Sequence, residues 1–199
     1  MVLSLSGKIV ELTELSLDDA APLAAAASEN RASYTHAHVP ADIEGMRRWV
    51  DLALAARAAS RQLPVVIRRT HTREVIGTTS FHLEHWPWPG RTTATHETPD
   101  AVEIGSTWLS HSAQGIGANR EAKFLLLDYA FTHWQVHRVR FRTDVRNARS
   151  RRAIESLGAT LDGILRADFS DPDATVRDSA YYSILASEWP TLRESFAAE

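Results

Sequence analysis

The amino-acid sequence predicts a mixed α/β fold, and three observations support this prediction. Segments that alternate between apolar and polar residues have the pattern of half-buried strands. Other segments repeat apolar residues at helical intervals, which is typical of helices with one buried face. The two kinds of segment are interleaved along a chain of 199 residues, a length that fits one domain. We therefore expect a single domain over residues 1–199.

The first half of the chain is predicted to hold three strands and two helices. The first helix is marked by Ser16, an N-cap residue that is followed by the acidic Asp19 in the first turn. In the second helix, Met46 and Val50 are among the apolar residues that fall on one side. The predicted elements are a strand at 8–15, a helix to about Glu29, a helix from about Asp42 to Ser60, and strands at 64–68 and 73–85.

The second half begins with a predicted strand that leads through a glycine-rich turn into a helix. In the strand after that helix, Arg138, Arg140 and Arg142 alternate with residues expected to face the core. A short helix is expected to stop at Gly158, because glycine is favoured just after a helix end. The predicted elements are a strand at 102–109, a helix at 118–133, a strand at 138–145, a helix at 148–157, and strands at 160–169 and 176–185.

Composition and charge exclude several classes of protein. The formal net charge is −3, so no general positive field would attract nucleic acid. No apolar run approaches the roughly 20 residues of a membrane span, and the first residues lack the pattern of a signal peptide. The chain has no cysteine, and its paired histidines have no third ligand in step, so neither a disulfide nor a metal site is expected. We expect a cytoplasmic protein that binds neither nucleic acid nor membranes.

The most informative stretch runs from a strand carboxylate, Glu103, to the start of a helix. The residues Gln114-Gly115-Ile116-Gly117-Ala118-Asn119 form the glycine-rich turn that opens this helix. A helix start leaves backbone N–H groups unpaired, and these donors and the helix dipole together favour an anion. The stretch predicts an enzyme that holds a phosphate-bearing cofactor and uses a carboxylate to remove a proton. A structural turn without a ligand is the alternative interpretation.

The motif Gln114-x-x-Gly117-x-Asn119 resembles the pyrophosphate loop of the GCN5-related N-acetyltransferases (GNAT), with Asn119 where most members have glycine or alanine. The order of predicted elements is also similar to that family. The resemblance implies the GNAT fold, a mixed and mostly antiparallel sheet of about seven strands flanked by about four helices. Strings that resemble its RimL/RimJ branch, which acetylates protein N-termini, are Glu103-Ile-Gly, Asn119-x-Glu-Ala-Lys123, Asp144-x-Arg-Asn147-x-Arg-Ser150 and Tyr-Ser-Ile-Leu-x-x-Glu-Trp-Pro190.

The resemblance implies acetyl-CoA as the cofactor. Main-chain groups at the end of the strand would pair with the pantetheine arm, and the side chain of Trp108 would serve packing. The alternative is that the pyrophosphate-loop motif begins at Ser112 instead of Gln114. We prefer Gln114, because Gly117 and Asn119 then lie at the helix start. The residues expected to bind the cofactor are Trp108, Leu109, Ser110, Gln114, Gly115, Ile116, Gly117, Ala118, Asn119 and Asn147.

Two residues are implied as catalytic. Glu103 has the spacing to Gln114 of the strand glutamate that acts as general base in several family members; the alternative is that it pairs with an arginine on a neighbouring strand. A base is needed because an amine that is protonated at pH 7 cannot attack a thioester. Where many members place a tyrosine acid this chain has Ile154, and RimL-like enzymes offer Ser150 instead. Ser150 would protonate the departing thiolate, with water or a helix-capping role as alternatives, and Asn147 is a cofactor contact or the N-cap.

The acceptor side carries no recognisable signature. His36 and His38 lie in the polar segment 30–40, where the family builds its acceptor site, and are the candidate substrate contacts. The proline-containing segment 86–99 is more typical of a variable surface loop, although it could line the substrate entrance. The arginines between residues 138 and 152 would form a solvated face with ion pairs or, in part, meet anionic groups.

By this resemblance the protein is expected to be an N-acetyltransferase in which a primary amine attacks acetyl-CoA directly in a ternary complex. The RimL-like strings favour the N-terminal α-amine of a protein or peptide as the acceptor. A small amine or an antibiotic is the close alternative. A non-catalytic acyl-CoA-binding sensor and a nucleotide-binding protein are the rivals from other classes. The family also implies a homodimer.

Overall fold

The computed structural model describes residues 3–86, 98–170 and 175–197. The chain folds as two compact units, Met1–Leu83 with Ile104–Leu126, and Glu84–Glu103 with Leu127–Glu199. Most of the predicted loop at 86–99, and residues 171–174 between the last two predicted strands, lie outside the described residues.

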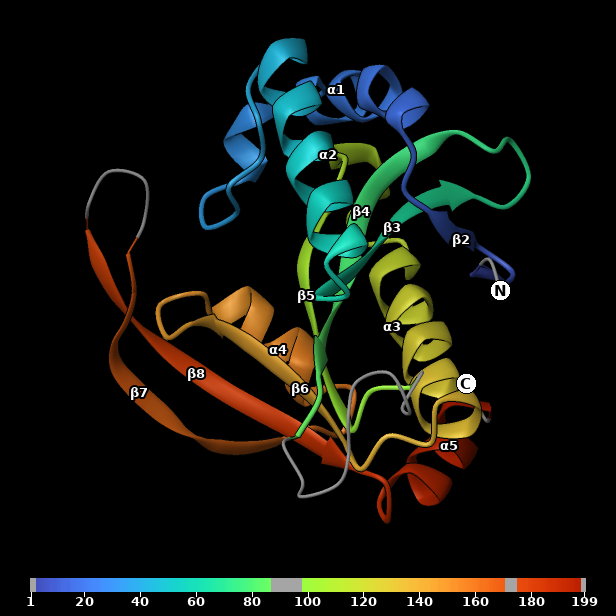
Figure 1. Cartoon of the computed structure of the whole chain (residues 1–199), viewed down its shortest axis with the longest axis vertical. Helices are drawn as coiled ribbons and strands as arrows, with labels where there is room; N and C mark the ends of the chain where they lie inside the picture. Colours follow the sequence, from blue (N-terminus) through green and yellow to red (C-terminus); the bar gives the residue numbers. More distant parts are fainter. Residues whose placement is uncertain (1–2, 87–97, 171–174, 198–199) are drawn as a thin grey trace. The chain divides into compact units, whose positions relative to one another are not determined.

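The first unit contains an antiparallel sheet and two helices that pack side by side (Figure 1). Strands β1 to β4 pair with one another in sequence order. The two helices bury Leu23, Met46 and Val50 in a core cluster that also contains Trp108. The elements are β1 (Ser4–Ser6), β2 (Val10–Glu14), α1 (Ala20–Ser28), α2 (Ile43–Ala58), β3 (Gln62–Arg69), β4 (Val75–Glu84), and parts of β5 (Ala101–Leu109) and α3 (Ala118–Asp128).

Both predicted helix starts in this unit are confirmed by their caps. The backbone N–H and the hydroxyl of Ser16 donate to Asp19 Oδ2 at 2.8 and 2.9 Å, and a short 3-10 turn then leads into α1. Helix α2 follows Asp42, whose Oδ1 accepts from the Gly45 N–H at 2.7 Å. These side chains satisfy donors that a helix start leaves unpaired.

In the second unit, the first half of β5 pairs in parallel with β6, while β6 and β7 each pair in antiparallel fashion with β8. Figure 1 shows β7 and β8 as one long hairpin. As predicted, Val139 and Phe141 are buried while the arginines that alternate with them are partly exposed, and α4 ends before Gly158. The elements are β6 (Arg138–Asp144), α4 (Ala148–Glu155), β7 (Thr160–Ser170), β8 (Val176–Leu185) and α5 (Trp189–Ala197).

The predicted class is confirmed, with two additions. Through β5, which belongs to both units, the strands follow the order β1-β2-β3-β4-β5-β6-β8-β7. The described residues form eight strands and five α-helices, so the predicted count misses β1 and α5. Strand β1 has three residues, too few to show an alternating pattern. No helix in the described ranges has the length and apolar character needed to cross a membrane.

Glu121 anchors α3 to the connection between β1 and β2. Its two carboxylate oxygens accept from the backbone N–H groups of Lys8, Ile9 and Val10 at 2.8, 2.7 and 2.7 Å. Hydrogen bonds to a charged acceptor are stronger than neutral ones. This one side chain therefore satisfies three backbone donors that are distant from it in sequence.

Lys123, two residues further along α3, is buried, with 6% of its surface exposed. Its Nζ donates to Thr107 Oγ1 at 2.7 Å and to Thr79 Oγ1 at 3.2 Å. The desolvation that accompanies burial lowers the pKa of Lys123 to about 7. Lysine is seldom buried without a carboxylate partner, so this position is unusual.

Strands β4 and β5 approach closely at Gly77. A Cβ atom at this position would overlap the carbonyl oxygen of Trp108 and lie 3.0 Å from Leu109 Cα. Both obstacles are backbone, which cannot rotate away as a flexible side chain would. Glycine is therefore required here for the two strands to approach.

We expect Glu121→Ala to lower the free energy of unfolding by about 2 to 3 kcal/mol, because it leaves three backbone donors without their charged acceptor. Urea unfolding measures the change. Glu44→Ala is the matched control, since Glu44 lies on a helix and pairs with the exposed Arg47. It should cost no more than about 0.5 kcal/mol. Equal losses in the two variants would contradict the anchoring role.

We expect the stability of the protein relative to Lys123→Met to rise with pH above about pH 7. The folded chain releases the Lys123 proton at about 7, whereas the unfolded chain holds it up to about 10.5. Between these values the unfolded state binds more protons, so raising the pH favours the folded state by up to about 1.4 kcal/mol per pH unit. Urea unfolding of both proteins near pH 7 and pH 9 tests this, and a pH-independent difference would contradict it.

Candidate active site

The glycine-rich turn has the geometry of an anion-binding helix start. Strand β5 ends at Leu109, and Gly115 and Gly117 both adopt left-handed backbone conformations, with φ of 80° and 86°. Helix α3 begins at Ala118, directly after Gly117. The side chain of Gln114 folds back, and its Nε2 donates to the carbonyl of Leu109 at 3.0 Å. The expectation that Gly117 and Asn119 lie at the helix start is confirmed.

The rival register that begins at Ser112 is disfavoured by the contacts of that residue. The N–H of Ser112 donates to Glu29 Oε2 at 2.8 Å, and its hydroxyl donates to Glu29 Oε1 at 3.1 Å. Burial would raise the pKa of Glu29, but the hydrogen bonds from Ser112 and Ser110 and the charge of Arg69 together lower it. Ser112 is thus engaged by a carboxylate, and an incoming phosphate would have to displace that negative charge.

The end of β5 is held firmly between neighbouring elements of the first unit. Trp108 is buried in the core cluster and meets Tyr34 edge to face, with ring centroids 5.9 Å apart. The expected packing role of its side chain is confirmed. Leu109 and Ser110 are also buried, and the Ser110 N–H donates to the carbonyl of Ile76 at 2.7 Å.

These features fit the cofactor that the motif implies. Two left-handed glycines precede a helix of 11 residues, and such a turn can present several backbone N–H groups to a phosphate. A Cβ at Gly115 would meet no atom within 4 Å, so the turn is open on that side. The segment Gln114–Asn119 is therefore suited to hold a pyrophosphate, and we assign it no other role.

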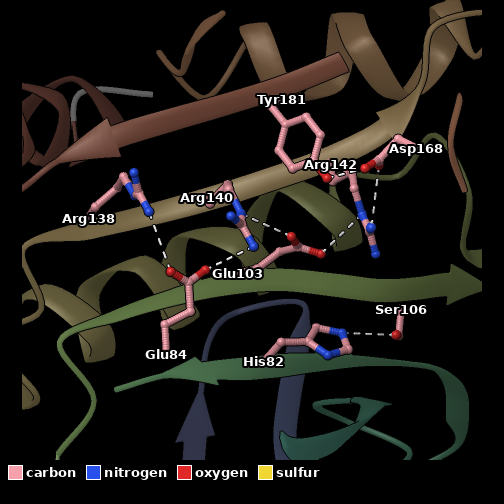
Figure 2. A network of polar contacts seen from close by, with 9 residues as sticks. All are labelled: His82, Glu84, Glu103, Ser106, Arg138, Arg140, Arg142, Asp168 and Tyr181. Atoms are coloured by element: carbon pink, nitrogen blue, oxygen red, sulfur yellow. Dashed lines mark hydrogen bonds and ion pairs between the residues drawn. The ribbon is translucent and has the colours of Figure 1, made fainter. Parts of the chain in front are cut away.

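In the second unit, Glu103 lies between two arginines of β6 (Figure 2). Its side chain is buried, and Arg140 Nε donates to Oε2 at 3.1 Å while Arg142 Nε lies 3.7 Å from Oε1. Parallel pairing of the strands sets this arrangement, since Glu103 is the register partner of Arg140. Pairing with an arginine of a neighbouring strand, the alternative raised by the sequence, is thus observed. Each carboxylate oxygen has two lone pairs, so these contacts leave Glu103 able to accept a further hydrogen bond.

The ion pairs continue on both sides of Glu103 as an alternating chain, which Figure 2 shows. On one side Glu84 pairs with Arg140 at 2.9 Å and with Arg138 at 3.4 Å. On the other side Asp168 lies 3.5 Å from Arg142 Nη1 and accepts from the Tyr181 hydroxyl at 2.8 Å. We refer to Arg138, Glu84, Arg140, Glu103, Arg142 and Asp168 as the arginine–carboxylate chain.

Opposite charges in this chain stabilise one another's ionised forms. Burial would lower the pKa of Arg142, but Glu103, Tyr181 and Asp168 raise it. Burial would likewise raise the pKa of Asp168, whereas the hydrogen bond from Tyr181 and the charge of Arg142 lower it. The result is a set of fixed charges around the most buried member, Glu103.

Helix α4 clarifies the roles of Asn147 and Ser150. Asn147 is the N-cap, and its Oδ1 accepts from the backbone N–H of Ser150 at 3.0 Å. The capping role expected for Asn147 is therefore confirmed, whereas the alternative that Ser150 caps this helix is wrong. Ile154, at the position of the tyrosine in many relatives, is buried.

The predicted acceptor-side histidines lie on the surface of the first unit. His36 and His38 are exposed in the segment that follows the 3-10 turn Arg31–Ser33. The same segment touches the end of β5, because Tyr34 packs on Trp108 and Gln114 Nε2 lies 3.4 Å from Ser33 Oγ. It is therefore placed next to the proposed cofactor residues of that unit.

The structure also shows side chains that the sequence did not single out. Glu84, Asp168 and Tyr181 complete the arginine–carboxylate chain, and Lys123 contacts β5 from α3. In the first unit, His82 Nε2 lies 3.1 Å from Ser106 Oγ. In the described part of the second unit, Glu103 contacts Arg140 and Arg142, whereas the backbone N–H of Ser150 bonds to Asn147. No grouping of three potential metal ligands is found in the described residues.

Comparisons with known proteins identify the family to which the chain belongs. The acetyltransferase (GNAT) domain family matches residues 10–160, whereas no curated protein sequence matches the chain. The structure is similar to a GCN5-related N-acetyltransferase from Brucella melitensis, with 26% identity, a TM-score of 0.81, and coverage of 98% of this chain and 84% of that one.

Two more distant structures share the fold. Mycobacterium smegmatis RimJ, in complex with CoA-disulfide, is 22% identical with a TM-score of 0.78, over 99% of this chain and 93% of that one. The microcin C7 self immunity acetyltransferase MccE, in complex with acetyl-CoA and AMP, is 19% identical with a TM-score of 0.73, over 90% and 93% of the two chains. With the family match covering most of its length, the chain belongs to the GNAT family and is an acetyl-CoA-dependent N-acetyltransferase.

Proposed function

We propose that the acceptor is the N-terminal α-amine of a protein or peptide, as in the RimL/RimJ branch of the family. The observation that carries this proposal is the set of RimL-like strings around the site, of which Glu103-Ile-Gly and Asp144-x-Arg-Asn147-x-Arg-Ser150 include both proposed catalytic residues. The structural likeness to RimJ is consistent with it. A single domain over residues 1–199 and a homodimer stay predictions.

The cofactor would be held by main-chain groups of the first unit. We assign the pyrophosphate to Gln114–Asn119, where the left-handed glycines and the start of α3 supply N–H donors. We assign the pantetheine arm to Trp108–Ser110, whose backbone N–H and C=O groups could pair with its amides. Acetyl-CoA supplies an activated thioester when bound. Asn147 is the further candidate contact, in addition to its role as N-cap.

Glu103 is our candidate for the general base. The acceptor amine attacks the thioester carbonyl, the carbon–sulfur bond breaks, and the proton lost by the amine goes to Glu103 directly or through water. Burial keeps this carboxylate in one orientation, and Arg140 and Arg142 fix both of its oxygens. The chain contains no cysteine that could form an acyl-enzyme, which favours direct attack by the amine.

Ser150 is our candidate for the group that donates a hydrogen bond to the departing thiolate and relays a proton to it, its hydroxyl regaining a proton from water. Because Asn147 caps α4, the Ser150 side chain is not required as the cap. A thiolate has a pKa near 8.5 and leaves without a strong acid, so the contribution of this hydroxyl is expected to be modest. Water is the alternative donor.

An α-amine suits such a site because its ordinary pKa is about 7.7 to 8.0, so a substantial fraction is already neutral near pH 7.5. A lysine side chain, with a pKa near 10.4, would depend more strongly on the base. A small amine or an antibiotic stays the alternative acceptor. The similarity to MccE, a self immunity acetyltransferase solved with acetyl-CoA and AMP, is the observation that keeps it open.

We expect Glu103→Gln to lower kcat/KM by about a hundredfold or more, because the amide cannot take the amine proton. Release of free CoA thiol measures turnover. Glu84→Gln is the matched control, since it removes a carboxylate from the same arginine–carboxylate chain without altering Glu103. It should change kcat/KM by only a few-fold. Equal losses in both variants would mean that Glu103 acts through the charges of the chain and not as the base.

We expect a peptide with a free N-terminus to be acetylated in preference to small amines. The test incubates the enzyme and acetyl-CoA with peptides that carry an internal lysine and either a free or a blocked N-terminus, and with a panel of small amines. Mass spectrometry locates the acetyl group. Acetylation of the blocked peptide or of small amines alone would contradict the proposal, and acetyl-CoA binding without turnover of any amine would favour the sensor.

A further inference from the structure

Lys123 belongs to a closed hydrogen-bond network that joins α3 to β4 and β5. Besides the contacts of its Nζ with Thr79 and Thr107, the two threonine hydroxyl oxygens lie 2.8 Å from each other. Each hydroxyl also lies 3.3 Å from the carbonyl oxygen of Gly105. Four groups from three elements of the first unit thus bind one another, with Lys123 and Thr79 buried and Thr107 and Gly105 partly buried.

The donors and acceptors of this network match a neutral lysine. A neutral amine has two N–H donors, and the structure gives Nζ two hydroxyl acceptors. An ammonium would carry a third N–H that these acceptors do not serve, and burial disfavours its charge. The hydroxyl protons are then available for the carbonyl of Gly105 and for each other.

The network surrounds a strained point in β5. Ser106 lies between Gly105 and Thr107 and has φ of 52°, a left-handed conformation that is unfavourable for a residue with a Cβ. Such a conformation persists only where its surroundings fix it, at a cost of about 1 to 3 kcal/mol. Here the network holds the residue on each side of Ser106, and His82 contacts its hydroxyl.

The bend at Ser106 also sets the direction of the residues that follow. Thr107 faces Lys123 of α3, while Trp108 packs into the core formed by α1 and α2. Main-chain direction at Trp108–Ser110 depends on this bend, and Gly77 brings β4 close to the same segment. A loss of the bend would therefore displace the groups to which we assign the pantetheine arm.

We propose that Lys123 is a positioning residue for acetyl-CoA: by holding Thr79 and Thr107 it fixes the bend at Ser106 and, through it, the main chain of Trp108–Ser110. This inference rests on the proposed placement of the pantetheine arm. Lys123 itself touches neither the acceptor nor the reacting atoms in this scheme. It acts on the affinity for the cofactor and not on the proton transfers.

The test is the affinity of the full chain for acetyl-CoA, measured by calorimetry without an acceptor. We expect Lys123→Met, which keeps the length of the side chain and removes its hydrogen bonds, to weaken binding about tenfold. Its stability near pH 7 should not fall, because methionine is buried without the cost of desolvating an amine. A residue with a merely structural role would instead lose stability and leave the affinity unchanged.

Thr107→Val is the second variant, since it removes the other end of the same hydrogen bond and keeps the shape of the side chain. It should weaken binding to a similar extent, and the double variant should be little worse than either single one. Wild-type affinity in Lys123→Met would overturn the proposal, as would fully additive losses.

Gly117→Ala separates this inference from the placement of the cofactor. A Cβ there would lie 3.1 Å from Ile9 Cδ1, and the residue would keep a left-handed backbone that disfavours alanine. Weaker binding in Gly117→Ala together with wild-type affinity in Lys123→Met would support the cofactor site and overturn the role of Lys123. Wild-type affinity in Gly117→Ala would contradict the cofactor placement itself.

Discussion

Helix α3 is fixed in the first unit by two side chains, Glu121 and Lys123, and the proposed cofactor site depends on this constraint. Glu121 binds the backbone between β1 and β2, and Lys123 binds hydroxyls of β4 and β5. Residues two apart on a helix project to nearly opposite sides, so the helix is held on both flanks. Its first turn, which follows Gly117, is thereby fixed in direction relative to the end of β5.

In the second unit, the arginine–carboxylate chain fixes the orientation of Glu103, and it does so through ion pairs. Buried ion pairs contribute little net stability, because desolvating the charges offsets much of their attraction. They do restrict orientation, since each guanidinium has donors in a fixed planar arrangement. Glu103 is held by two such groups, Arg140 and Arg142, and these pair in turn with Glu84 and Asp168. A role in proton transfer and a role in the ion pairs are compatible for this carboxylate.

Features that depend on nearby residues were predictable from the sequence. The cap at Ser16, the helix start near Asp42, the helix start after Gly117 and the alternation in β6 all follow from patterns within a few residues. Contacts that depend on strand register were not predictable. The sequence indicates that an arginine lies near Glu103, but it does not indicate which arginine. Lys123 was missed for a related reason. A lone lysine on a helix is usually exposed, and only the packing of α3 on β4 and β5 shows that it is not.

Gly77 limits how this acetyltransferase can diversify. The spacing between β4 and β5 is set there by the absence of an atom, since any side chain would overlap the Trp108 carbonyl. A substitution of Gly77 would push β4 and β5 apart next to Trp108–Ser110, the segment to which we assign the pantetheine arm. Variation that alters the choice of acceptor while keeping the acyl donor is therefore left to other parts of the chain. In the segment that carries them, His36 and His38 are exposed and therefore have room to vary.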